Sequence, residues 1–265
     1  MSAIFIYGRP GSGKSTFAAS FTKLGYRVHF IDVDNKIKTM RNLKPLIQAQ
    51  SVTTVPIESP VEESTLLQRA KGGIGYKPTR LPQGYFEICE VIENAATNPP
   101  EDAAHTVLVL DSLSRVNEHM ARLLQHHSKD GKLGYDGWAA VLQNYESLFD
   151  TFYKLQPEPY AHCIICAHAK EDDNQILKVV ESRPMIDGQF REKAGSYVDE
   201  MFYTFVDVKN KNAPAEFLAY TKPVGPVLQA RTSIESLDVI VEQDFSEIFK
   251  GESVKRLPVK TGKKK

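Results

Sequence analysis

Short apolar runs alternate along this chain with longer stretches in which apolar residues recur at helical spacing. The short runs predict buried strands at residues 3–7, 26–33, 52–57, 106–111 and 162–167. Helical spacing marks residues 14–21, 85–96, 111–127 and 138–155. This alternation is typical of an α/β fold built on a mostly parallel sheet.

The last third of the chain has a different pattern. Residues 170–175 are polar and follow the strand at 162–167. Two apolar runs, 201–208 and 217–221, are joined by a lysine-rich segment, which predicts an antiparallel pair late in the sheet. Residues 227–230 are expected to add one more strand.

Two segments interrupt or follow this pattern. Residues 58–85 contain several glycines and prolines among basic residues, which predicts a mobile loop or an insertion. Residues 253–265 carry six Lys or Arg and no acid, so we expect residues 251–265 to be a basic, disordered tail. Residues 1–250 are then expected to form one domain.

Composition excludes several classes of protein. The formal net charge is zero, so no overall field draws the chain to nucleic acid or membrane. We expect no membrane span and no signal peptide, because no apolar run reaches eighteen residues and the first strand begins at once. Cys163 and Cys166 lie three apart in a strand and face opposite ways, so we expect buried thiols in a cytoplasmic protein.

The strongest chemical signal follows the first strand, where residues 8–16 fit the pattern G-x-x-x-x-G-K-[ST]. In such a loop the backbone N–H groups surround phosphate oxygens, and the start of the next helix adds positive potential. Lys14 is expected to reach the β- and γ-phosphates, and Ser15 to bind Mg²⁺. The predicted nucleotide-binding residues are Gly8, Arg9, Pro10, Gly11, Ser12, Gly13, Lys14, Ser15 and Thr16.

A second signal is Asp111, which ends the apolar run 106–110. A carboxylate at the carboxyl end of a parallel strand lies where α/β sheets bind ligands. Beside a phosphate loop it can hold Mg²⁺ together with Ser15. At least one strand, residues 26–33, intervenes in sequence between the loop strand and Asp111. This spacing suits the P-loop class with an additional strand and not a small nucleotide kinase.

Several segments together resemble one family, the RecA-like P-loop ATPases. In particular, the chain resembles compact phage relatives described as phage nucleotide-binding or single-strand-annealing ATPases. The similarity spans roughly residues 3–235 and implies a three-layer P-loop NTPase with a RecA-like core, an ATPase domain over residues 1–250. Besides the loop, the segments that carry it are residues 30–34, 111–112, 164–170, 208–217 and 229–232.

The resemblance also implies roles for later residues. His168, after the strand at 162–167, corresponds to a polar sensor of the γ-phosphate, and the region 170–191 corresponds to one that binds DNA. Lys209 and Lys211 match lysines that reach the nucleotide of a neighbouring subunit, and Arg231 is a further trans-acting candidate. No segment precedes the first strand to dock a neighbour, so a ring or short filament is expected rather than a long filament.

The general base stays open. Glu62 or Glu63 is offered by one alignment, and Gln83 or Glu87 by another. Asp32 and Asp34 are interpreted as strand-end carboxylates, one of which could contact the catalytic water.

The combined hypothesis is a Mg²⁺-dependent ATPase that acts on single-stranded DNA in phage-type recombination or annealing, in the bacterial host cytoplasm if it is phage-encoded. A first alternative is a nucleotide-dependent assembly or loading factor with weak turnover, whose partner is a single-strand-binding protein or another replication component. A second alternative is a small-molecule kinase.

Overall fold

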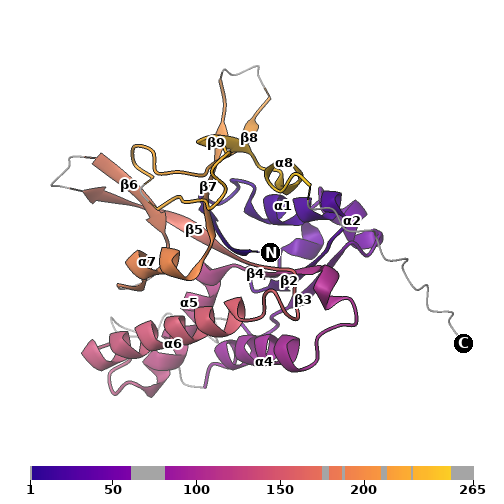
Figure 1. Cartoon of the computed structure of the whole chain (residues 1–265). Coiled ribbons are helices and arrows are strands. Elements are labelled where there is room, and N and C mark those ends of the chain that lie inside the picture. Colours follow the sequence, from indigo (N-terminus) through magenta and orange to yellow (C-terminus); the bar gives the residue numbers. More distant parts are fainter. Residues whose placement is uncertain are drawn as a thin grey trace, which may run out of the picture.

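The computed structural model describes residues 2–60, 81–174, 179–186, 189–209, 214–227 and 229–251. Within them, nine strands form the sheet seen in Figure 1: β1 Ala3–Gly8, β2 Arg27–Asp32, β3 Val52–Pro56, β4 Thr106–Asp111, β5 His162–Asn174, β6 Val179–Pro184, β7 Glu200–Asp207, β8 Glu216–Tyr220 and β9 Ile240–Glu242. The α-helices are α1 Lys14–Ala19, α2 Lys44–Gln48, α4 Gly84–Thr97, α5 Leu113–His127, α6 Tyr135–Tyr153, α7 Phe190–Lys193 and α8 Phe245–Ile248.

The strand order is β3-β2-β4-β5-β1-β7-β8-β9, and β6 pairs only with the outer part of β5. All pairings from β3 to β7 are parallel, whereas β8 is antiparallel to β7 and β9 to β8. The predicted α/β fold with a mostly parallel sheet and late antiparallel strands is therefore confirmed. One strand, β5, lies between β1 and β4.

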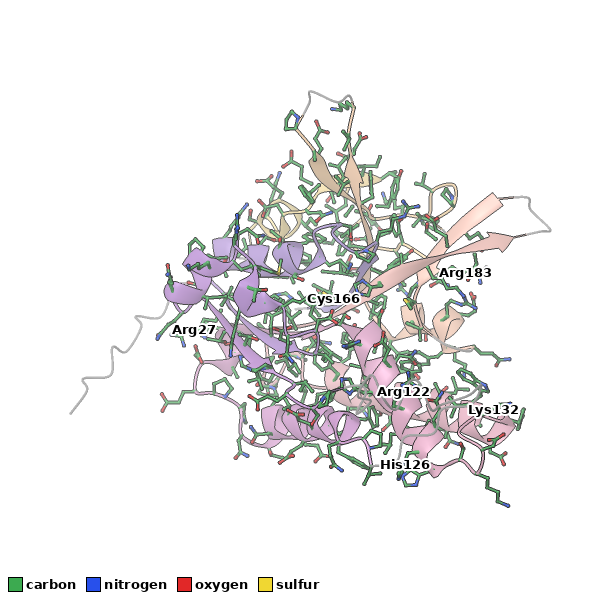
Figure 2. The ribbon with its side chains drawn as sticks, turned by 180° about the vertical axis from the view of Figure 1, so that it is seen from behind. Arg27, Arg122, His126, Lys132, Cys166 and Arg183 are labelled. Carbon is green, nitrogen blue, oxygen red and sulfur yellow. The ribbon has the colours of Figure 1, made fainter. Side chains whose placement is uncertain are left out.

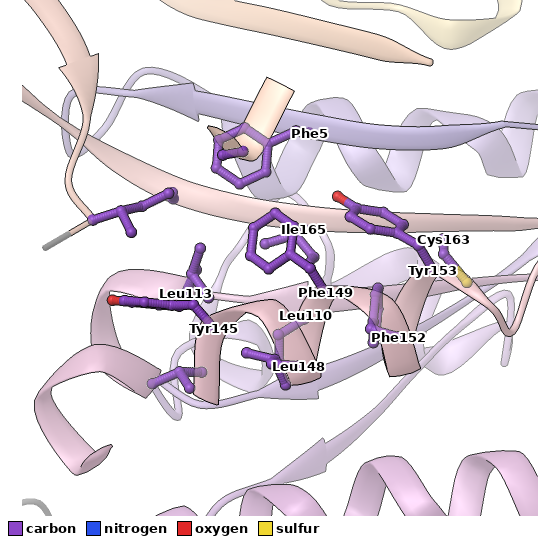
Figure 3. Close-up of a cluster of buried hydrophobic side chains, with 14 of the residues drawn as sticks. Phe5, Leu110, Leu113, Tyr145, Leu148, Phe149, Phe152, Tyr153, Cys163 and Ile165 are labelled. Atoms are coloured by element: carbon purple, nitrogen blue, oxygen red, sulfur yellow. The ribbon is translucent and has the colours of Figure 1, made fainter. Parts of the chain in front are cut away.

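Helices cover both faces of the sheet, so the domain has three layers. Residues of the central strands alternate between two buried clusters, as expected for strands that are buried on both sides. One cluster joins the sheet to α4, α5 and α6; in Figure 3, Phe5 of β1 lies near Phe149 of α6, with their ring centroids 5.9 Å apart. The other cluster joins the sheet to α1, α2 and α8.

The two cysteines of β5 follow this alternation. Cys163 belongs to the cluster under α6, and Cys166 to the cluster under α1. Both are free and fully buried, and burial raises the pKa of each thiol far above its ordinary value. The expectation of buried, unpaired thiols is confirmed.

The largest difference from the sequence prediction is the length of β5. The polar residues 170–174 were expected to lie outside a strand, but β5 continues through them and pairs with β6 as an antiparallel hairpin. This hairpin extends beyond the body of the domain in Figure 1. Its charged side chains pair along each strand and with α7, as in Arg183–Glu181 and Arg191–Asp172, so polar residues can form a ladder that hydrophobic periodicity does not reveal.

Smaller differences occur at three places. Helix α6 starts at Tyr135, three residues before the position that periodicity indicated. Of the expected strand at 227–230, residue 228 lies outside the described residues; Val227 makes an isolated bridge with Val224, and residues 229 and 230 are not in a strand. Strand β9 was not foreseen, because three residues are too few to show a period.

Some expectations fall on residues that the structure does not describe: most of the loop 58–85 (residues 61–80), Lys211, and all but the first residue of the tail 251–265. Among the helices in the described ranges, none is long and apolar enough to cross a membrane.

The segment after β9 is tied to the phosphate-loop helix by aromatic stacking. The ring of Phe245 in α8 lies 4.1 Å from that of Phe17 and 4.3 Å from that of Phe21, centroid to centroid. Phe245 is fully buried, so the last helix closes the core behind α1.

We predict that Phe245→Ala lowers the free energy of unfolding by about 3–5 kcal/mol, since it removes a buried ring and leaves a cavity. Phe86, 47% exposed on α4, is the matched control; Phe86→Ala is expected to cost less than about 0.5 kcal/mol. Denaturant unfolding of both variants measures the difference. Equal losses would show that α8 is not part of the core.

Candidate nucleotide-binding site

The loop after β1 is held in a shape that requires glycine at two positions. A Cβ on Gly8 would lie 2.2 Å from Thr204 Oγ1 and 2.4 Å from the Thr204 carbonyl oxygen. Gly13 has φ of +96°, and a Cβ there would lie 2.2 Å from Oε1 of Gln243. The loop backbone is therefore packed directly against β7 and the turn after β9, which leaves no room for a side chain at Gly8 or at Gly13.

Hydrogen bonds fix the outer side of the loop. Ser12 Oγ lies 2.7 Å from Thr204 Oγ1, and Gln243 Nε2 donates to the carbonyl oxygens of Ser12 and Leu218 at 2.8 Å each. Sequence reasoning missed Thr204 and Gln243, because neither belongs to a motif and only the folded chain brings them to the loop.

Lys14 is held inside the loop. Its side chain is buried, and Nζ donates to the carbonyl oxygens of Gly8 and Arg9 at 3.0 Å each. Burial lowers the pKa of its ammonium, while the nearby carboxylate of Asp111 opposes that effect. The ammonium is thus positioned at the loop and largely withdrawn from bulk water.

Ser15 and Asp111 meet at the carboxyl edge of the sheet. Ser15 Oγ donates to Asp111 Oδ2 at 2.5 Å. Burial raises the pKa of Asp111 to about 6, and the hydrogen bond from Ser15 limits that rise. A hydroxyl and a carboxylate are oxygen ligands of the kind that Mg²⁺ prefers, and it completes its shell with phosphate oxygens and water.

These groups line a cavity of about 400 Å³ at the loop. Its walls come from the loop, the ends of β2 and β4, the residues after β2, His168 of β5 and Phe217 of β8: Pro10, Gly11, Gly13, Lys14, Ser15, Thr16, Asp32, Asp34, Lys36, Ile37, Met40, Asp111, His168 and Phe217. The described residues contain no cluster of three or more His, Cys, Asp or Glu that could hold a metal ion on their own.

His168 also lines this cavity, and it is the partner of Gly8 in the parallel pairing of β1 and β5. Its backbone N–H donates to Ser114 Oγ at 2.9 Å. Burial, with a smaller effect of Lys14, lowers the pKa of the imidazole, which keeps it neutral at pH 7. Within the described residues its buried Nδ1 has no hydrogen-bond partner.

Two carboxylates at and after the end of β2, those of Asp32 and Asp34, have different hydrogen-bond donors. Asp32 is buried and accepts from the backbone N–H groups of Lys36 and Ile37, at 3.1 and 2.9 Å. Asp34 is less buried and accepts from Ser112 Oγ at 3.1 Å. Asp32 thus shapes the loop, while Asp34 has capacity left toward the cavity.

The other candidates for the base lie elsewhere. Glu87 does not line the cavity; its carboxylate accepts from the backbone N–H groups of Glu58 and Ser59. Partial burial alone would raise the pKa of Glu87, but these hydrogen bonds outweigh it and lower it. Gln83 precedes α4 and donates to Leu81, and Glu62 and Glu63 lie outside the described residues.

Two of the residues expected to act on a neighbouring subunit, Lys209 and Arg231, are described, and both lie outside the lining of this cavity. Lys209 follows β7 and pairs with Glu216 at 2.8 Å. Arg231 bridges to Met201 near the start of β7 and donates to the carbonyl oxygen of Gly195 at 2.8 Å. Neither residue lines the cavity of its own chain.

Comparison with known families gives one match that covers most of the chain: the model of a family described as an AAA domain matches residues 2–232. No curated protein matches the sequence.

Solved structures give weaker similarities. Flagellar accessory protein FlaH from Methanocaldococcus jannaschii is 15% identical, with a TM-score of 0.46, over 90% of this chain and 83% of that one. KaiC-like protein PH0186 from Pyrococcus horikoshii OT3 is 12% identical, with a TM-score of 0.39, over 83% of this chain and 78% of that one. Neither similarity bears on function.

We predict that Gly8→Ala destabilises the protein by about 1–3 kcal/mol and abolishes the thermal stabilisation that ATP gives, because the methyl group forces the loop away from Thr204. Gly134 is the control, since a Cβ there meets nothing within 4 Å. Thermal unfolding with and without MgATP is the measurement. A Gly8→Ala protein that behaves like Gly134→Ala would contradict the close packing.

Proposed function

The chain belongs to the AAA-domain family, and on that premise we propose that it is a Mg²⁺-dependent ATPase acting on single-stranded DNA in phage-type recombination or annealing. The observation that carries the ATPase part is the meeting of Ser15 and Asp111 beside the buried Lys14 in one cavity. Ser15 and Asp111 would hold Mg²⁺, which supplies charge stabilisation to the phosphates when it is bound. Lys14 and the loop N–H groups bind and orient the β- and γ-phosphates.

Asp34 is the general base in this proposal. A base must lie within hydrogen-bond reach of the attacking water, and Asp34 lines the cavity with Lys14 and His168. Ser112 Oγ orients its carboxylate by donating to Oδ2. His168 would report the γ-phosphate, since it lines the cavity together with Lys14 and Asp111.

We predict that Asp34→Asn lowers the turnover number for ATP by about 10²–10⁴-fold while ATP still binds, because the amide cannot accept the proton of water. Glu87→Gln is the matched control and is expected to retain turnover, since Glu87 does not line the cavity. Steady-state phosphate release and ATP binding are measured side by side. Loss of turnover in Glu87→Gln but not in Asp34→Asn would reverse the assignment.

The turn between α5 and α6 and the first turn of α6 carry exposed aromatic rings and two lysines, beside Asp130 and Asp136. Tyr135 is 90% exposed and Trp138 is 45% exposed, and Tyr135 borders a second cavity of about 450 Å³ that is also lined by Lys129 and Lys132. Exposed aromatic rings stack bases, and lysines contact the backbone phosphates. Figure 2 places Arg122, His126 and Lys132 at this end of the helix pair.

Helix α5 joins this turn to the nucleotide cavity. It begins at Leu113, immediately after Asp111 and Ser112, and ends at His127, which lines the second cavity. A movement of Asp111 or Ser112 on nucleotide binding would therefore reach the turn through one helix, a shift of a kind that switching proteins use.

The region 170–191, which the family resemblance connects with DNA, is a weaker candidate. Arg183 pairs with Glu181 and with Glu192, and Arg191 pairs with Asp172 at 2.5 Å. Cations that are already paired release little counterion on meeting phosphate, so they add little affinity for DNA.

We also propose that the active form is a homo-oligomer, a ring or short filament, in which Lys209, Lys211 and Arg231 act on the neighbour's nucleotide. This is consistent with the position of Lys209 and Arg231 outside the cavity of their own chain.

We predict that the double change Tyr135→Ala, Trp138→Ala weakens binding of an oligo-dT strand at low salt by about tenfold or more, since each stacked base contributes about 1–3 kcal/mol. Phe86→Ala removes a ring of similar exposure, 47%, from α4 and is expected to bind normally. Fluorescence anisotropy of labelled oligo-dT at two salt concentrations is the readout. Equal affinity of all three proteins would place the DNA elsewhere.

The paired charges of the β5–β6 hairpin favour a second candidate function, an assembly or loading factor with weak turnover. A hairpin whose charged side chains are already paired with opposite charges is a better binding surface for a protein than for DNA. If oligo-dT neither binds nor raises ATP turnover, this candidate replaces the first. Phosphate transfer to a metabolite instead of water would favour a kinase.

A further inference from the structure

The nucleotide cavity has two ends, which lie on opposite sides of β1. On one side lie Asp34, which follows β2, Asp111 at the end of β4 and His168 in the middle of β5. Strand β8 lies on the other side, two positions from β1, and contributes Phe217. The polar groups are therefore gathered at one end of the cavity, and an aromatic ring stands at the other.

This asymmetry sets the direction of a bound nucleotide. Hydrolysis needs the γ-phosphate close to the metal ligands and to the base, so the terminal phosphate must face Asp34, Asp111 and His168. The triphosphate then follows the loop, and the nucleoside leaves it toward β7 and β8. The first side chain that lines the cavity on that side is Phe217.

Phe217 is placed and held as a fixed surface. A Cβ on Gly13 would lie 3.0 Å from Cδ1 of Phe217, so the ring edge touches the loop. The Phe217 carbonyl oxygen accepts from the backbone N–H of Gln243 at 3.1 Å, and the same glutamine side chain binds the loop at Ser12. Gln243 thus binds both the loop and the backbone of Phe217.

Phe217 is nevertheless 47% exposed. Its partner in the β7–β8 pairing, Val206, is 38% exposed. A ligand that covered these two apolar side chains would gain free energy by removing their surface from water. A purine base has a flat apolar face of the size that such a ring can cover.

We propose that Phe217 is the platform on which the nucleobase stacks. This inference rests on the proposed nucleotide site, and it adds the nucleoside end of that site. Stacking uses the face that all bases share, so the platform contributes equally to ATP and GTP and does not select between them.

The test is the affinity of the full-length chain, with Mg²⁺, for ATP, GTP and inorganic tripolyphosphate, measured by calorimetry. Phe217→Ala is expected to raise the dissociation constants of ATP and GTP by about tenfold, the effect of losing one stacked base. Tripolyphosphate has no base, and its dissociation constant should change by less than about twofold. Phe217→Tyr keeps the ring and should bind all three ligands like the unmodified chain, as should the exposed control Phe86→Ala.

Two results would overturn the platform. One is a Phe217→Ala protein that binds ATP as tightly as the unmodified chain; a change of oligomeric state with that result would assign the ring to an interface between copies. The other is an equal loss of ATP and tripolyphosphate, which would mean that Phe217 only supports the loop at Gly13.

The same titrations separate this inference from the proposed activity. If the unmodified chain binds ATP and tripolyphosphate but releases no phosphate, hydrolysis is wrong and the platform stands. If the unmodified chain binds neither ligand, the nucleotide site and the platform both fail.

Discussion

The hydrogen bond between Ser15 and Asp111 is the contact on which the rest of the site depends, because it joins the helix that follows β1 to the end of β4, a strand that is not a neighbour of β1. Strand β5 lies between β1 and β4, so only side chains at the carboxyl edge can cross it. The order of the strands therefore decides which side chains can contact the same phosphate. It brings Lys14, Asp34 and His168 to the same cavity and leaves Glu87 outside.

The loop is also held from the far end of the chain. Thr204 of β7 and Gln243 after β9 bind its outer side, and Phe245 stacks on the helix that follows it. Thr204, Gln243 and Phe245 do not line the cavity. They fix the backbone so that its N–H groups need little rearrangement to receive phosphate, which is the condition for electrostatic catalysis.

Sequence alone predicted the parts that depend on local pattern. The loop strand, Asp111 at a strand end and the opposite facing of Cys163 and Cys166 follow from periodicity and motif, and the structure has all three features. The β5–β6 hairpin was missed because polar and charged residues continue β5 beyond Ala169, and these leave no hydrophobic period.

The choice among carboxylates, and the roles of Gln243 and Phe217, could not be predicted either. They depend on contacts between segments separated by more than 75 residues, such as Ser112 with Asp34 and Gln243 with Ser12.

The measurement that tests the account most directly is phosphate release from ATP by the full chain and by Lys14→Ala, with Mg²⁺ present. The account predicts steady release by the unmodified chain and a loss of it in Lys14→Ala, which keeps its fold. Undiminished release by Lys14→Ala would contradict it.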